Sequence, residues 1–138
     1  DEYVKTGKIR LVFKDLQFLK ADSTKLGIAS RAVWEAAPGK YYDWHKLMFE
    51  NQGQLDLTTN EKLSALTAQA LGKANADKAM SLMTAKAAAY QVLIDADKTE
   101  GASFGARSTP SFIIGNQLIV GLKPYSEIKA AIEISLKK

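Results

Sequence analysis

The sequence predicts an α/β protein in which two strand regions flank a long helical block. The first region, residues 8–13, alternates apolar and charged side chains, a pattern typical of a strand. The second, residues 111–120, contains two short apolar runs separated by Gly115-Asn116, a pair that favours a two-residue hairpin turn. Between these regions apolar residues recur at helical spacing, which indicates amphipathic helices.

Proline and glycine divide the helical block into separate helices. Pro38-Gly39 and Gly72 each interrupt a helical pattern, and the spacing from Thr58 to Glu61 predicts a capping box at a helix start. The alanine-rich stretch 77–104 predicts one long helix or two helices broken near Thr84. The expected helices run from the cap candidates Asp22-Ser23-Thr24 to Pro38-Gly39, from about residue 40 to 52, from the cap at Thr58 to Gly72, and from residue 77 to about 104. A last helix begins at Pro124 and buries Ile128, Ile132 and Leu136.

Composition limits the class of protein. The chain has 138 residues, of which 46% are hydrophobic and 25% charged, as expected of one ordinary soluble domain. Its apolar runs fall short of the roughly 20 residues that a spanning helix needs, so no membrane insertion is expected. The net charge of +4 comes from lysines spread along the whole chain among carboxylates, which argues against nucleic-acid binding.

The segment around Thr109-Pro110 carries the strongest functional signal. Proline cannot donate a hydrogen bond to a sheet ladder, and an X-Pro bond is the one place where a cis peptide costs little. A Thr-Pro step that opens an apolar strand is therefore a candidate recognition loop. The sequence contains no cysteine, so any reading of this loop as part of a redox site must account for the missing thiols.

Three blocks in this order resemble the DsbA-like branch of the thioredoxin superfamily. They are the start of the chain through residue 15, the aromatic stretch 42–52 and a third block from the helix before the Thr-Pro loop to the last helix. The third block is the most specific, with Asp97, Glu100, Gly101, Gly105, Thr109, Pro110, Phe112, Ile114, Gly121, Pro124 and Tyr125 in matching places.

The resemblance implies a thioredoxin-like fold with an inserted α-helical domain. Residues 1–20 and 85–138 would form the thioredoxin-like part, and residues 21–84 the insertion. The family's first strand and its Cys-x-x-Cys motif would precede residue 1. Such a strand would lie between residues 8–13 and 111–114 in the sheet.

The function that the resemblance implies is protein thiol:disulfide exchange, with Ser108, Thr109 and Pro110 binding the substrate. The partners would be thiol- or disulfide-bearing proteins and a membrane redox protein, in the periplasm or outside the cell, with no cofactor and no metal. A redox-inactive thioredoxin-like module that binds peptides is the alternative. In either case this cysteine-free chain should be redox-inactive by itself.

Other candidate residues have structural interpretations. The single histidine, His45, lies in an aromatic helix and is expected to be packed or hydrogen-bonded rather than to act as an acid or base. Aromatic residues of the same helix could line a peptide groove, but packing of the inserted helices is favoured for Tyr41, Tyr42 and Trp44. A solvated helix face, offset by Lys98, is expected for the carboxylates Asp95, Asp97 and Glu100.

Overall fold

The structure, a computed structural model, describes residues 2–17, 21–54 and 59–137. It divides into two compact units. We call Gln17–Asp95 the helical unit, and the pair of segments Asp1–Leu16 and Ala96–Lys138 the end unit, because the latter contains both ends of the chain. The predicted insertion limits of residues 21 and 84 remain a prediction.

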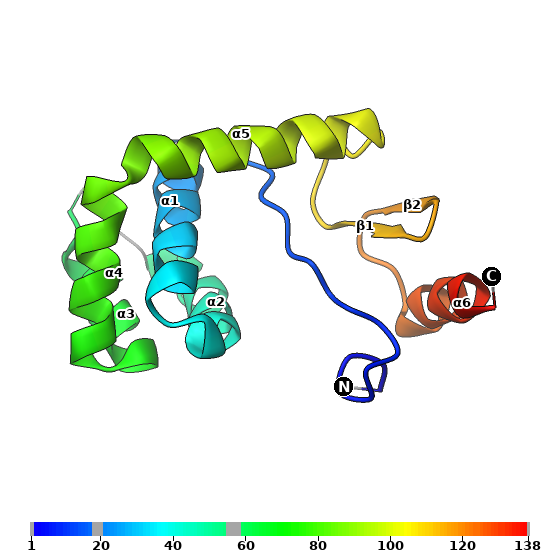
Figure 1. Cartoon of the computed structure of the whole chain (residues 1–138), viewed down its shortest axis with the longest axis horizontal. Helices are drawn as coiled ribbons and strands as arrows, with labels where there is room; N and C mark the ends of the chain where they lie inside the picture. The colour runs from blue at the N-terminus through cyan, green and yellow to red at the C-terminus, as the bar shows by residue number, and fades with distance from the viewer. Residues whose placement is uncertain (1, 18–20, 55–58, 138) are drawn as a thin grey trace. The chain divides into compact units, whose positions relative to one another are not determined.

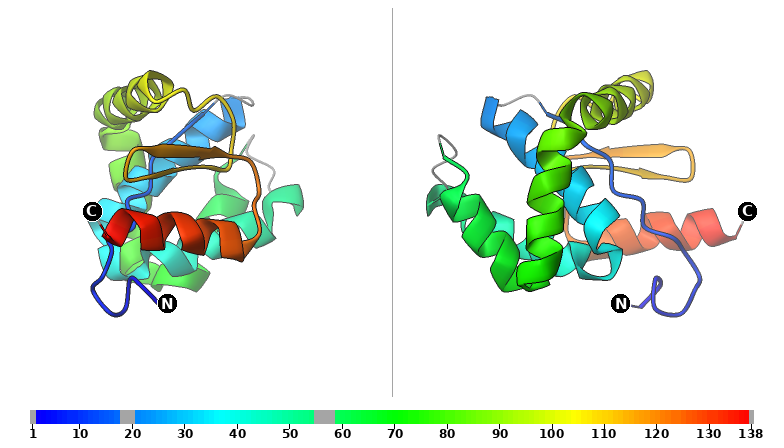
Figure 2. Two further views of the ribbon diagram at one scale, coloured as in Figure 1. Left: turned by 90° about the vertical axis from the view of Figure 1, so that its right-hand side faces the viewer. Right: turned by 60° about the vertical axis from the view of Figure 1, so that its left-hand side comes forward.

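The helical unit consists of helices joined by short connections (Figure 1). Helix α1 spans Ala21–Ala36, and a single 3-10 turn, Pro38–Lys40, leads into α2, Tyr41–Glu50. A second such turn, Gln52–Gln54, follows α2, and the next helices are α3, Glu61–Leu71, and α4, Lys73–Ala85. Helix α5, Ala87–Ser103, begins in this unit, so the alanine-rich stretch forms two helices that separate at Lys86. Helices α1 and α4 lie side by side in every view (Figure 2).

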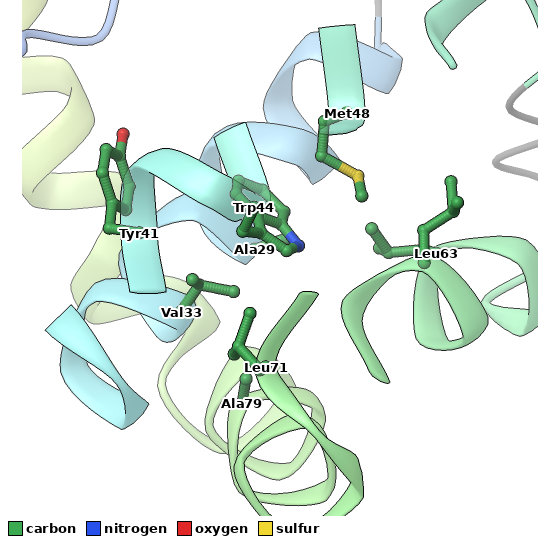
Figure 3. Packing of buried hydrophobic residues seen from close by; sticks show 9 residues of the cluster. Ala29, Val33, Tyr41, Trp44, Met48, Leu63, Leu71 and Ala79 are labelled. Carbon is green, nitrogen blue, oxygen red and sulfur yellow. The ribbon is translucent and has the colours of Figure 1, made fainter. Parts of the chain in front are cut away.

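The core of the helical unit forms where α1, α2, α3 and α4 meet (Figure 3). Val33, Trp44 and Leu63 are at most 2% exposed. The indole Nε1 of Trp44 donates to Oγ1 of Thr67 at 3.0 Å, so the one polar atom of this buried ring is satisfied. Tyr41 is also buried, which confirms the packing interpretation for Tyr41 and Trp44. Tyr42, by contrast, is exposed.

The start of α3 differs from the predicted capping box. Asn60 is the N-cap residue and its side chain makes no capping hydrogen bond. Instead the backbone N–H of Glu61 donates to Oγ1 of Thr59 at 3.4 Å. Thr58, the predicted cap, lies outside the described residues. The observed N-cap therefore lies two residues after the predicted one.

The end unit begins with hydrogen-bonded turns over residues 2–7. Gly7 has φ of 72°, and the N–H groups of Gly7 and Lys8 donate to the carbonyls of Val4 and Tyr3. This is the bond pattern that closes a helix at glycine. The buried Tyr3 donates through its hydroxyl to Glu133. These turns are therefore fixed to the last helix, α6, which spans Tyr125–Leu136.

Residues 8–16 have no regular secondary structure, so the predicted strand at residues 8–13 is wrong. A strand exists only through hydrogen bonds to a neighbour, and the sheet of the described residues contains just β1 and β2. Leu11 and Val12 are each more than 50% exposed. Leu11 and Val12 are adjacent, so they would lie on opposite faces of a strand, and both faces would suit burial. Within the part of the chain that the structure describes, however, no neighbouring strand covers either face.

The hairpin of the end unit matches its prediction. Strand β1, Ser111–Ile114, pairs antiparallel with β2, Gln117–Val120, and Ile114 faces Gln117 across the turn. The left view of Figure 2 shows this hairpin beside α6. Pro124 is the N-cap of α6 rather than its first residue. The predicted burial of Ile132 is confirmed, whereas Leu136 is 44% exposed because it lies at the final residue of the helix.

Candidate functional site

The end of α5 sets where the Ser108 to Pro110 loop begins. The N–H of Ala106 donates to the carbonyl of Gly101 at 2.9 Å, and that of Gly105 to the carbonyl of Ala102 at 2.9 Å. These two bonds form the Schellman motif, which requires a left-handed residue, and Gly105 supplies it with φ of 83°. Ala106 is buried directly after this turn. The chain therefore leaves α5 in a fixed direction before it reaches the loop.

Two hydrogen bonds hold the loop on either side of Thr109. Oγ of Ser111 donates to the carbonyl of Ser108 at 2.6 Å, and the N–H of Gly121 donates to the carbonyl of Pro110 at 2.8 Å. Thr109 itself is exposed and makes no backbone hydrogen bond to any other described residue. The peptide bond between Thr109 and Pro110 is cis. Thr109 is thus an exposed residue between two neighbours that hydrogen bonds hold in place.

Sequence reasoning identified the three loop residues but missed the two that hold them. Ser111 and Gly121 lie at the start of β1 and just after the end of β2. In the sequence, the glycine at position 121 could have indicated this arrangement. In the structure Gly121 has φ of 82°, a left-handed conformation that favours glycine. A glycine that directly follows an apolar strand could have been read as the residue that closes the hairpin onto the loop.

The loop has no group that could perform thiol chemistry. The chain contains no cysteine, and the side chains of the loop offer only hydroxyl groups. On its other side β1 has no strand partner among the described residues, so its edge can accept an extended chain. Among the described residues, no three histidine, cysteine, aspartate or glutamate side chains gather as metal ligands would. Peptide recognition is the chemistry that this arrangement supports.

Asp97 corrects the prediction of a solvated carboxylate face. It is only 7% exposed, and it accepts hydrogen bonds from Nζ of Lys14 and from the backbone N–H of Asp15, both at 3.0 Å. Nζ of Lys14 also donates to Oε2 of Glu100 at 2.7 Å. Both carboxylates raise the pKa of the Lys14 amine, and the hydrogen bond to Glu100 has the larger effect. Asp95 and Glu100 are exposed, as predicted. The partner of Asp97 is therefore Lys14, far away in the sequence, rather than Lys98.

His45 is packed between aromatic rings, which confirms its structural interpretation. Its imidazole lies 5.8 Å from the ring of Tyr41 and 4.7 Å from that of Phe49, measured between centroids. Burial lowers the pKa of His45 below its ordinary value, so the neutral ring is favoured. The residue belongs to the helical unit and the loop to the end unit.

A family model described as thioredoxin matches residues 1–134. The chain belongs to the thioredoxin family. A curated relative, Disulfide bond formation protein D of Bacillus subtilis (strain 168), is 25% identical in an alignment of 138 residues that covers 99% of this chain and 61% of the relative. The chain therefore spans about three-fifths of the length of this relative. No solved structure matches the chain.

Family membership confirms the expected fold class, a thioredoxin-like α/β domain with added helices. It also confirms the resemblance to disulfide-forming proteins at the level of the family. The chain contains no cysteine, so redox activity does not follow from membership. Among the described residues no helix has both the length and the apolar character needed to span a bilayer.

Proposed function

We propose that this chain is the substrate-recognition part of a DsbA-like protein thiol:disulfide oxidoreductase. The observation that carries the proposal is the Ser108 to Pro110 loop, in which Thr109 is exposed between two anchored neighbours and makes no backbone hydrogen bond to another described residue. An extended substrate segment would pair with the backbone of Thr109. Ser108, Thr109 and Pro110 are the binding residues in this proposal.

The thiols of this enzyme would belong to a Cys-x-x-Cys motif that precedes residue 1. A thiolate at a helix N-terminus has a lowered pKa and attacks a disulfide through a mixed-disulfide intermediate. Two electrons and two protons then pass between the enzyme pair and the substrate pair. Residues 8–16 form no strand within the described part of the chain, and this supports the proposal because the strand that precedes the motif in this fold would run beside residues 8–13.

The proposed substrates are proteins that carry thiols or disulfides outside the cytoplasm, since the relative is a disulfide bond formation protein. The proposed place of action is the periplasm or the cell exterior. A membrane redox protein would return the enzyme to its starting redox state. This last partner rests on the family resemblance alone.

The test compares the natural protein, including any residues before Asp1, with the 138-residue chain. We expect the natural protein to convert a reduced, unfolded model protein to its disulfide form, with two thiols lost for each disulfide, and the chain alone to have no such activity. A natural protein that carries no Cys-x-x-Cys and leaves the model thiols unchanged would refute the oxidoreductase.

Peptide binding tests the loop independently of thiol chemistry. In an NMR titration with an extended cysteine-free peptide, the amide signal of Thr109 should shift. The redox-inactive binding module would give this result together with a negative exchange assay. An unchanged Thr109 amide would exclude the loop as the recognition site in both cases.

A further inference from the structure

The positive charge of the chain lies mainly in the end unit. That unit contains ten lysines and arginines against seven aspartates and glutamates, whereas the helical unit contains nine against eight. Three of the four excess positive charges therefore belong to the end unit. Since the Thr109 loop is part of this unit, the charges that lie near the loop bear on what it binds.

The segment that contains the loop and the hairpin carries only positive charge. From residue 101 to residue 126 the charged residues are Arg107 and Lys123. Glu100, just before this segment, accepts a hydrogen bond from Lys14 at 2.7 Å. Glu127, just after it, lies 4.0 Å from Lys123. Arg107 is the cation of this segment that no carboxylate in the described part of the chain offsets.

Arg107 directly precedes the loop and is exposed. Its side chain makes no hydrogen bond or ion pair to another described residue. The chain just before it is held in place, because Ala106 is buried and its N–H donates to the carbonyl of Gly101. Arg107 and Thr109 are two residues apart, so their Cα atoms are separated by at most about 7 Å. The long guanidinium side chain can therefore reach a peptide that pairs with Thr109.

Lys123 is connected to the other side of the loop through the hairpin. The N–H of Gly121 donates to the carbonyl of Pro110 at 2.8 Å, and Lys123 follows Gly121 by two residues. The side chain of Lys123 is 41% exposed, and 4.0 Å to Glu127 is long for an ion pair, so that carboxylate offsets its charge only in part. Two cations thus lie within three residues of the anchored Pro110 along the chain or across this bond.

We propose that Arg107, assisted by Lys123, selects substrate segments that carry a glutamate or aspartate beside the residue that pairs with Thr109. The proposal rests on the proposed function of the loop and names its substrate class. A guanidinium is permanently charged and can bind a carboxylate through two parallel hydrogen bonds. A lysine or arginine at the same place in the substrate would meet like charge and be disfavoured.

Three matched peptides test the preference on the natural protein. They are extended, cysteine-free and of equal length, and they differ at one position, which is glutamate, glutamine or lysine. In an NMR titration that follows the Thr109 amide, we expect the glutamate peptide to bind about threefold tighter than the glutamine peptide, as an exposed ion pair allows, and the lysine peptide to bind most weakly. The difference should shrink between about 20 mM and 500 mM salt, because salt screens exposed charges.

Variants of the arginine test the residue itself. Arg107→Gln should abolish most of the preference for glutamate, and Arg107→Lys, which retains the charge, should keep part of it. The matched control is Arg10→Gln, which removes the same charge from another exposed arginine of the end unit and should leave the preference unchanged. Equal Kd values for the glutamate and glutamine peptides would overturn the proposal. An equal effect of Arg10→Gln would also overturn it, because the net charge of the protein would then be the cause.

Exchange kinetics separate this proposal from the proposed function. With dithiol forms of the glutamate and glutamine peptides, each oxidised to its disulfide as the enzyme disulfide is reduced, the natural protein should show the lower KM for the acidic peptide. A natural protein without exchange activity that still prefers the acidic peptide would refute the oxidoreductase and keep the charge selection. Exchange activity with equal KM for both peptides would refute the charge selection alone.

Discussion

Nζ of Lys14 lies 3.0 Å from Oδ1 of Asp97, a bond between residues 83 positions apart. Asp97 is buried within the end unit, and its second oxygen accepts the backbone N–H of Asp15 at 3.0 Å. The carboxylate therefore fixes the extended segment 8–16 to the C-terminal part of α5 through a side chain and the main chain at once.

Asp97→Ala should destabilise the protein by about 2 kcal/mol, because it removes charge-assisted hydrogen bonds and leaves the N–H of Asp15 without its acceptor. Urea unfolding measures this loss. The matched control is Glu100→Gln: that side chain, 53% exposed, also contacts Lys14, and a surface pair contributes at most about 1 kcal/mol. Equal losses in the two variants would contradict the anchoring role of Asp97.

Gly27→Ala should destabilise the protein by about 1 kcal/mol. A Cβ at position 27 would lie 1.8 Å from Nε2 of Gln17 and 3.3 Å from Cδ1 of Ile94. The Gln17 amide would have to move, and its hydrogen bond to the carbonyl of Thr24 would be lost. In a Gln17→Ala background the same change should cost less or stabilise, since alanine is favoured over glycine inside a helix by roughly 0.5–1 kcal/mol. Identical effects in both backgrounds, measured by urea unfolding, would exclude the clash.

Thr67→Val should cost about 1–3 kcal/mol, because the buried indole N–H of Trp44 loses its acceptor. The Thr67 hydroxyl also donates to the carbonyl of Leu63 at 2.6 Å, so the change removes two bonds from the core. In a Trp44→Phe background no indole N–H remains, and Thr67→Val should cost distinctly less. A double-mutant cycle by chemical unfolding measures this coupling, and a coupling of zero would contradict the bond.

Stability should fall as the pH drops below 6.5, the ordinary pKa of histidine, because burial lowers the pKa of His45 in the folded protein. The unfolded chain then binds the proton first, and protonation favours unfolding. His45→Gln should flatten the Tm profile between about pH 7 and pH 5. Glu2 and Glu35, with pKa values lowered below 4.5 by hydrogen bonds from Lys129 and Lys86, lose their charge only at lower pH. A His45→Gln profile as steep as that of the unchanged chain would exclude this histidine as the source.

Local patterns predicted the helices and the hairpin, because helical spacing and the Gly115-Asn116 turn depend on neighbours in the sequence. The same patterns could not show that residues 8–13 have no strand partner in the described part of the chain. Alternation indicates which side chains suit burial, but not which element lies beside them. Nor could they pair Asp97 with Lys14, because a helix pattern compares only residues three or four positions apart. The sequence shows that α2 is rich in aromatic residues. Which of these rings are exposed depends on how α1 packs against α2, and the sequence alone does not show that packing.

The close approach at Gly27 also bears on the order of folding. Gln17 and Ile94, at the two limits of the helical unit, both come within contact distance of a Cβ at this position. Joining Lys14 to Asp97 in an unfolded chain would close a loop of 83 residues, at an entropic cost of about 4 kcal/mol. Once the helical unit has formed, its first and last residues already lie close together. The contacts within that unit then offset most of the entropic cost of closing the loop. We therefore expect the helical unit to fold first and to serve as the short connection on which the two segments of the end unit assemble.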